Sequence, residues 1–154
     1  MLVYRLSPHS FSGDLAGEGN RLHGGRWNPK GIPAIYTCEH PAVTLLEVLV
    51  HVNKISLLPA YDLVTIEVPD SLKMFMPALT DLPADWQTQP VPSSTIAFGQ
   101  DWLVKSVYPL LRVPSVIMYP FSSNILINPR HPDVQGKLRI ADITPWKFDA
   151  RLKP

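Results

Sequence analysis

A short glycine-rich segment carries the first side chains that could bind a ligand. Gly24 and Gly25 directly precede Arg26 and Trp27. Paired glycines let a backbone approach a ligand closely, and the planar guanidinium of an arginine binds phosphate or pyrophosphate through two parallel hydrogen bonds. Trp27 could pack against the loop or against a base. The residue types equally allow a tight turn in which Arg26 pairs with a structural carboxylate, so both interpretations stay open.

A carboxylate inside an apolar segment is the second candidate. Glu47 is the only charged residue between positions 42 and 50, and Tyr36 lies near the end of the preceding apolar run. A carboxylate in such surroundings must be paired, have a perturbed pKa or face a cleft. The alternative is a solvated helix face shared with His51, four residues later. A solvated face is the more common case, but Val43 and Val48 flank it too, so little of this helix looks wet and both interpretations stay open.

The remaining polar candidates are weak when taken singly. Ser115 follows a proline, and Asn124 and Asn128 enclose a short apolar run. Serine and asparagine at such positions are most often turn residues. No histidine or cysteine pair has the spacing of metal ligands, so no metal site is predicted. The single Cys38 follows an apolar run and is expected to be a small buried hydrophobe rather than a nucleophile.

Short strands and few helices must position these residues. The segment 12–31 is predicted to be a functional loop, and the proline-rich segment 69–96 an irregular insertion. This order predicts an α+β fold with a small mixed or mostly antiparallel sheet and a few flanking helices. Strands are expected at residues 2–6, 32–38, 62–68, 113–119 and 138–143, a short strand or turn at 124–129, and helices from His40 to about Asn53 and from Asp101 to Leu111.

Length and charge narrow the class of protein. The 154 residues fit one domain, 1–154. With 14 basic and 13 acidic residues, the net charge of +1 predicts no direct binding to nucleic acid or to a membrane surface. One cysteine allows no intramolecular disulfide, and residues 1–7 lack the pattern of a signal peptide. A cytoplasmic location is therefore expected.

Taken in order along the chain, these segments resemble the RES domain, which is named for its Arg, Glu and Ser signature. Each segment alone is weakly specific, whereas the ordered set is fairly specific and covers nearly the whole chain. The resemblance rests on Tyr4-Arg5, Gly24-Gly25-Arg26-Trp27-Asn28, Ile35-Tyr36, Leu46-Glu47, Gly99-Gln100-Asp101-Trp102, Val113-Pro114-Ser115, Asn124-Ile125-Leu126-Ile127-Asn128-Pro129 and His131.

The resemblance implies a fold similar to that of ADP-ribosyltransferases, and a toxin of a bacterial type II toxin–antitoxin pair that degrades NAD⁺ as its substrate without a prosthetic group. The implied partner is an Xre-type antitoxin with a helix-turn-helix domain, and a homodimer within the complex is compatible with it. The implied catalytic positions are Arg26, Tyr36, Glu47 and Ser115. Dinucleotide contacts are expected from Gly24, Gly25, Arg26, Trp27, Tyr36, Asn124 and Asn128.

By this resemblance, Glu47 would stabilise positive charge on the ribose while the nicotinamide–ribose bond breaks. Arg26 would clamp the pyrophosphate, Tyr36 would stack on the nicotinamide or ribose, and Ser115 would hydrogen-bond one of these groups. Water as acceptor gives a hydrolase, phosphate a phosphorylase, and a protein side chain an ADP-ribosyltransferase. RNA 2′-phosphotransfer uses a similar fold, but the weak basic character argues against it. A non-catalytic binding module that keeps the fold is the alternative of another class.

Overall fold

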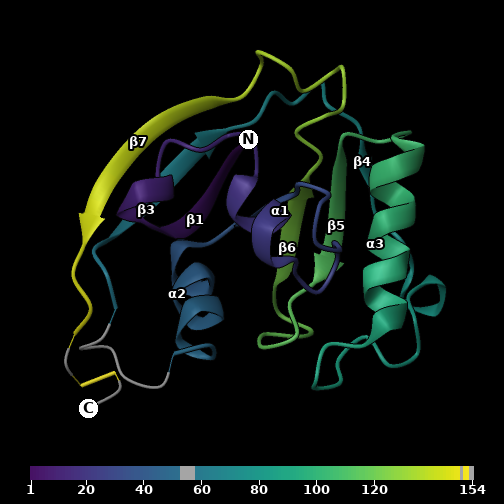
Figure 1. Cartoon of the computed structure of the whole chain (residues 1–154), viewed down its shortest axis with the longest axis horizontal. Coiled ribbons are helices and arrows are strands. Elements are labelled where there is room, and N and C mark those ends of the chain that lie inside the picture. Colours follow the sequence, from purple (N-terminus) through teal and green to yellow (C-terminus); the bar gives the residue numbers. More distant parts are fainter. Residues whose placement is uncertain (53–57, 150, 153–154) are drawn as a thin grey trace.

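A computed structural model of the chain describes residues 1–52, 58–149 and 151–152. Within these residues, seven strands form one sheet in the order β4-β5-β6-β2-β1-β3-β7, with three α-helices around it (Figure 1). The strands are β1 (Leu2–Pro8), β2 (Ile35–Cys38), β3 (Tyr61–Glu67), β4 (Met74–Phe75), β5 (Leu110–Pro114), β6 (Ser123–Ile127) and β7 (Arg139–Trp146), and the helices are α1 (Glu18–His23), α2 (Pro41–Leu49) and α3 (Ser93–Lys105).

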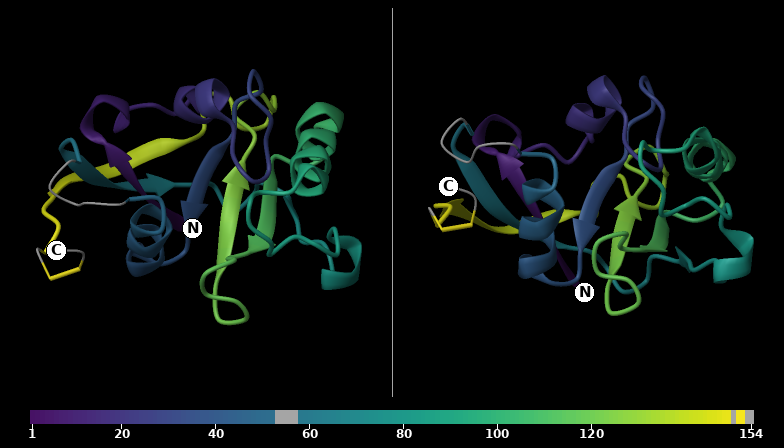
Figure 2. Two further views of the ribbon diagram at one scale, coloured as in Figure 1. Left: turned by 60° about the horizontal axis from the view of Figure 1, so that its bottom comes forward. Right: turned by 90° about the horizontal axis from the view of Figure 1, so that it is seen from below.

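The pairing of the strands confirms the α+β prediction. All neighbouring strands run antiparallel except β4 and β5, which are parallel. Figure 2 shows that the strongly twisted sheet separates into a β1–β3–β7 side next to α2 and a β6–β5–β4 side next to α3. The short β2 lies between these two sides and pairs with both β1 and β6.

Alternation along the strands divides the core between two faces of the sheet. Ile125 and Ile127 of β6 pack with the valines and isoleucines of β1 and β3. Leu126, which lies between them in sequence, packs on the opposite face with Trp27 and Trp102. This is the period of two that a strand buried on both faces requires.

The second face is covered by α3, which contacts the backbone of the glycine-rich loop closely. An ideal Cβ built on Gly99 would lie 1.8 Å from the carbonyl oxygen of Trp27, so only glycine fits. The Trp27 ring meets Phe98 edge to face, with centroids 5.9 Å apart. These contacts of α3 with Trp27 therefore fix the position of the loop that carries Arg26.

Several predicted boundaries were wrong. The helix predicted to start at Asp101 begins at Ser93 and ends at Lys105, and the segment from Leu110 is a strand. Asp101 does not cap the helix; it pairs with Lys105 one turn later, at 2.8 Å. The strand predicted over 113–119 spans Leu110–Pro114, because the chain turns after Pro114.

The two segments predicted to be irregular contain regular structure. The loop 12–31 holds α1, and the insertion 69–96 holds β4, a 3-10 helix at Leu79–Asp81 and the first turn of α3. The strand expected over 32–38 is confined to Ile35–Cys38, and β7 extends beyond the predicted 138–143. α2 ends at Leu49; its predicted end near Asn53 lies outside the described residues.

Candidate active site

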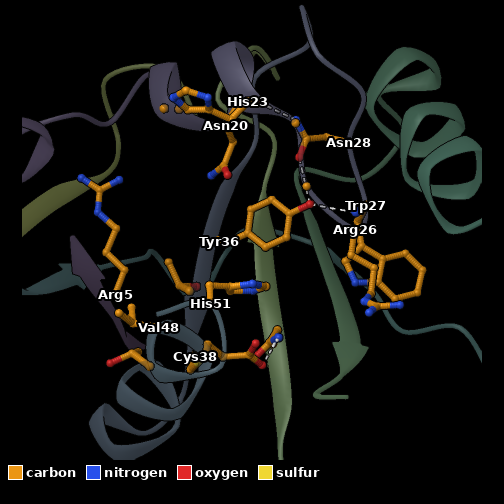
Figure 3. Close-up of a pocket in the computed structure, with 18 of the residues that line it drawn as sticks. Arg5, Asn20, His23, Arg26, Trp27, Asn28, Tyr36, Cys38, Val48 and His51 are labelled. Carbon is orange, nitrogen blue, oxygen red and sulfur yellow. Dashed lines mark hydrogen bonds between the residues drawn. The ribbon is translucent and has the colours of Figure 1, made fainter. Parts of the chain in front are cut away.

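A single hollow of about 900 Å³ gathers most of the side chains singled out in the sequence (Figure 3). Its wall is built by β1, the loop 24–30, β2, α2, the segment 89–96 and the ends of β5 and β6. A cavity of this size falls within the range of pockets that bind cofactors and other small ligands. Predicted residues that line it are Gly24, Gly25, Arg26, Trp27, Tyr36, Glu47 and Asn124.

Glu47 reaches the pocket from α2. Pro41 at the first position starts this helix, as its fixed φ allows, and Val43 and Leu49 bury its apolar side. Oε1 of Glu47 accepts hydrogen bonds from Ser115 Oγ at 3.0 Å and from Asn124 Nδ2 at 2.9 Å. The carboxylate is therefore held by two donors on one oxygen. Thr44 and Val48 of the same helix also line the pocket, as does His51 just beyond its end, so this side of α2 faces a cleft.

Ser115 is a partner of Glu47 rather than a wall residue of the pocket. Its side chain is fully buried, and its Oγ also accepts a hydrogen bond from the Met118 backbone at 3.2 Å. Ser115 thus donates its one hydroxyl proton to the carboxylate of Glu47. This differs from the expected direct contact between Ser115 and the nicotinamide or its ribose.

Tyr36 fixes the shape of the glycine-rich loop. Its hydroxyl accepts a hydrogen bond from the Trp27 backbone N–H at 2.8 Å and donates one to Asn28 Oδ1 at 2.9 Å. Burial raises the pKa of this hydroxyl well above its ordinary value, so it stays neutral and can donate. A Cβ on Gly25 would lie 2.6 Å from the Tyr36 hydroxyl oxygen, which explains the glycine.

Arg26 lies across the pocket from α2, as Figure 3 shows. Its Nη1 donates to the carbonyl oxygens of Trp86 and Thr88 at 2.8 and 3.1 Å. Burial lowers the pKa of the guanidinium, and the charge of Glu47 opposes that shift. The two opposite charges therefore share one pocket without an ion pair between them among the described residues.

Two predicted contact residues do not present their side chains to the pocket. Trp27 is only 2% exposed and packs in the core, so the loop-packing interpretation holds for its ring. Asn128 does not line the pocket; its Nδ2 donates to the carbonyl of Leu103 and to Ser106 Oγ, which fixes the end of α3. Asn128 therefore lies outside the pocket wall, contrary to the prediction.

Cys38 lies beside the Glu47 cluster as a buried thiol. Its Sγ donates to Asn124 Oδ1 at 3.0 Å. Burial, followed by the charges of Glu47 and Glu39, raises the pKa of the thiol to about 12. A thiol in this state is a poor nucleophile. It helps to orient the Asn124 amide instead.

Three parts of the pocket wall had no role predicted from the sequence. Asn28 connects the two ends of the loop, because its Nδ2 donates hydrogen bonds to the carbonyls of Asn20, Pro29 and Ile32. Gln89 and Val91 come from the segment predicted to be an irregular insertion. Arg5 reaches the pocket from β1. The arginine in the segment Tyr4-Arg5 was a usable signal, but nothing in the sequence placed it beside residues 24–51.

The described ranges contain neither a metal-binding cluster nor a membrane-spanning helix. No group of three or more His, Cys, Asp or Glu side chains there could hold a metal ion. No helix among these residues has the length and apolarity needed to cross a membrane.

The arrangement can be compared with known proteins. The RES domain family matches residues 2–149. A relative from Sphingobium sp., named "Prs ADP-ribosylating toxin", is 38% identical over 90% of this chain and 86% of its own length. The "Toxin Res" of Yersinia enterocolitica is 36% identical over 99% of this chain and its entire length.

A solved structure shares the fold. In the M. tuberculosis MbcT–MbcA toxin–antitoxin complex, one chain superimposes with a TM-score of 0.76 at 24% identity, covering 94% of this chain and 83% of that one. The family match, the identities and the common fold agree over nearly the whole length. The chain therefore belongs to the RES domain family and is a RES-type toxin.

Proposed function

We propose that this toxin cleaves the nicotinamide–ribose bond of NAD⁺. The observation that carries the proposal is the carboxylate of Glu47, held through one oxygen by Ser115 and Asn124 on the wall of a pocket that also contains Arg26. The name of the Sphingobium relative, which describes ADP-ribosylation, supports NAD⁺ as the substrate.

The reaction suits a site with one fixed carboxylate. The bond from ribose to nicotinamide breaks with its electron pair moving onto the pyridine nitrogen, which becomes neutral, so no general acid is needed. Positive charge then develops on the ribose as an oxocarbenium-like state. A fixed carboxylate stabilises this charge more strongly than it stabilises the ground state, which is the condition for acceleration.

The other residues would position the dinucleotide. Arg26 keeps Nε and Nη2 for phosphate oxygens, because only Nη1 binds the carbonyls of residues 86 and 88. The Tyr36 ring would pack against the nicotinamide or ribose, since its hydroxyl is used by the loop. Gly24 and Gly25 would let the backbone of the loop approach the ligand closely. Asn124 and Ser115 act on the substrate through Glu47.

The acceptor defines two outcomes. With water, the ribose carbon forms a bond to an oxygen whose proton moves to Glu47 or to solvent, and free ADP-ribose results. With phosphate, an anionic phosphate oxygen forms the bond without losing a proton, and phosphorylated ADP-ribose results. With a protein side chain, the same pocket is an ADP-ribosyltransferase, and the Sphingobium relative's name favours this second candidate. Mass spectrometry of small products and of modified proteins, with and without phosphate, separates the outcomes.

An antitoxin partner belongs to the same proposal. The solved structure that shares the fold is a toxin–antitoxin complex, and the sequence resemblance implies an Xre-type helix-turn-helix protein. Co-expression with the product of a neighbouring gene of this kind should restore growth and cellular NAD⁺. Failure of such a protein to bind the toxin would remove the Xre assignment.

Substitution of Glu47 tests the chemistry directly. Glu47→Gln keeps the shape but removes the charge, so we expect NAD⁺ turnover to fall by at least about 10²-fold. Glu67→Gln is the matched control, because that carboxylate pairs with Arg139 on β7 and lies outside the pocket. Wild-type turnover by a folded Glu47→Gln protein, with NAD⁺ followed in vitro and in expressing cells, would defeat the assignment.

A further inference from the structure

Each of the two donors to Glu47 is itself held by a second group. Ser115 Oγ accepts a hydrogen bond from the Met118 backbone N–H at 3.2 Å. Asn124 Oδ1 accepts one from Cys38 Sγ at 3.0 Å, while Nδ2 of the same amide donates to Glu47 Oε1 at 2.9 Å. A thiol, an amide and the carboxylate therefore form one chain of hydrogen bonds, and the proposed reaction gives a role only to its last two members.

The register of the sheet fixes the contact between Cys38 and Asn124. The two residues are directly opposite each other in the antiparallel pair of β2 and β6, where side chains on one face lie about 5 Å apart at Cβ. On its other edge, β2 places Cys38 opposite Tyr4 of β1. Cys38 lines the pocket beside α2 (Figure 3) and is only 4% exposed. Because its strand is paired along both edges, the thiol has little freedom to move away from the amide.

The amide needs a partner at each end to keep one orientation. An asparagine side chain has nearly the same shape after its oxygen and nitrogen exchange places, so hydrogen bonds decide how it lies. The carboxylate of Glu47 accepts hydrogen bonds, so Nδ2 of Asn124 faces it. Oδ1 requires a donor, which the thiol of Cys38 supplies. Burial raises the pKa of this thiol to about 12, so the proton that it donates is retained at neutral pH.

We propose that Cys38 is a positioning residue for the cleavage reaction, because its thiol holds the Asn124 amide in the orientation that donates to Glu47. The inference rests on the proposed function, and it adds a residue that acts through its neighbour rather than on the reacting atoms. In a chain of hydrogen bonds each donor strengthens the next. Loss of the thiol therefore weakens the support of the carboxylate, which slows the chemical step and changes binding of the dinucleotide little.

A purely structural role for Cys38 predicts the opposite order of variants. Buried cysteines behave as small hydrophobes; in that role Cys38→Ala is tolerated, whereas Cys38→Ser is harmful because it buries a hydroxyl. If the thiol is needed as a donor, Cys38→Ser retains the function and Cys38→Ala loses it. The two variants differ by one oxygen atom, so their comparison separates the donor from the lost volume.

Steady-state kinetics with NAD⁺ tests this order. We expect Cys38→Ala to lower kcat by about 3- to 10-fold, the range for one hydrogen bond between uncharged groups, with KM within about twofold of wild type. Cys38→Ser should restore most of the kcat. Thr95→Ala is the matched control, because this buried hydroxyl bonds the Pro92 carbonyl at 2.8 Å and lies outside the pocket wall. It should lower the Tm and leave kcat unchanged.

A double-mutant cycle shows whether Cys38 acts through the amide. In an Asn124→Ala background the thiol has no acceptor left, so Cys38→Ala should cause no further loss of kcat. An equal loss in both backgrounds would overturn the inference, as would a Cys38→Ala protein with wild-type kcat or a Cys38→Ser protein no faster than the alanine variant. If Cys38→Ala does not fold, Cys38→Thr and Cys38→Val form a second pair that differs in the hydroxyl donor, and equal kcat values in these two would overturn it.

The resonance of the Asn124 side-chain amide tests the contact without turnover. In ¹⁵N-labelled protein without nucleotide, the signal is identified by its absence from Asn124→Ala. We expect it to shift, and its protons to exchange faster with water, in Cys38→Ala but not in Cys38→Ser. An unchanged signal in Cys38→Ala would overturn the positioning role. A changed signal in that variant, together with a wild-type protein that leaves NAD⁺ intact, would refute the proposed cleavage alone.

Discussion

The environment of Glu47 could be predicted in part from its neighbours in the sequence. A carboxylate among apolar neighbours indicated a cleft or a pairing, and the structure shows a cleft. Its partners could not be deduced, because Ser115 and Asn124 are separated from it by 68 and 77 positions and meet it only through the packing of α2 against the sheet. Ser115 therefore supports the carboxylate, where direct contact with the substrate was expected.

Ser115→Ala should slow the chemical step. Loss of one hydrogen bond to a charged group corresponds to roughly a 10- to 100-fold effect, and we expect it in kcat with KM little changed, since Ser115 does not line the pocket. Ser122→Ala is the control, because that nearby buried hydroxyl has no partner in the described structure. Steady-state kinetics that show equal losses in both variants, or a change in KM only, would contradict this role.

Cys38 should be inert towards alkylation in the native protein. With the pKa of the thiol raised to about 12, the reactive thiolate fraction falls about tenfold for each pH unit below that value, whereas an unfolded cysteine titrates near 8.5. Iodoacetamide labelling at pH 8 should be at least about 100-fold slower in native than in urea-unfolded protein. Comparable rates, measured by mass spectrometry, would show that the thiol is not held in this state.

At the scale of elements, strands were recognised better than the boundaries of helices. The alternation of Val64 and Ile66 marks β3 clearly, because this period is a local property. α3 was predicted eight positions too late, since Gly99 and the prolines before it are poor helix formers. Gly99 is tolerated because the backbone of Trp27 occupies the space of a side chain, which is a tertiary contact.

Gly99→Ala should separate α3 from the loop that carries Arg26. The new methyl group would meet the Trp27 carbonyl oxygen at 1.8 Å, so we expect the free energy of unfolding to drop by about 1–3 kcal/mol, together with weaker nucleotide binding. Gly19→Ala in α1 meets nothing within 4 Å and should be neutral or slightly stabilising. Denaturant unfolding of both variants tests this; a Gly99→Ala protein as stable as wild type would show that the contact relaxes freely.

At the scale of the whole molecule, the fold class followed from the order of predicted elements, but the order of strands did not. The sequence places β1 first, yet the sheet places it between β2 and β3 and close to the pocket. This order brings Arg5 and Asn124, from opposite ends of the chain, to the wall of one hollow. Such an arrangement depends on long-range pairing, which local patterns do not encode.

Because the pocket joins segments from residue 4 to residue 124, global unfolding must destroy it, and a bound ligand should stabilise the entire domain. A ligand at 100 times its Kd adds about 2.7 kcal/mol to the free energy of unfolding, which for a domain of this size raises the Tm by roughly 5–10 °C. We expect this shift with ADP-ribose in wild-type and Glu47→Gln protein, since the carboxylate acts mainly on the transition state. Arg26→Ala should show a much smaller shift at the same ADP-ribose concentration. Differential scanning calorimetry measures both, and an unshifted wild-type Tm at saturating ADP-ribose would mean that the hollow does not bind this nucleotide.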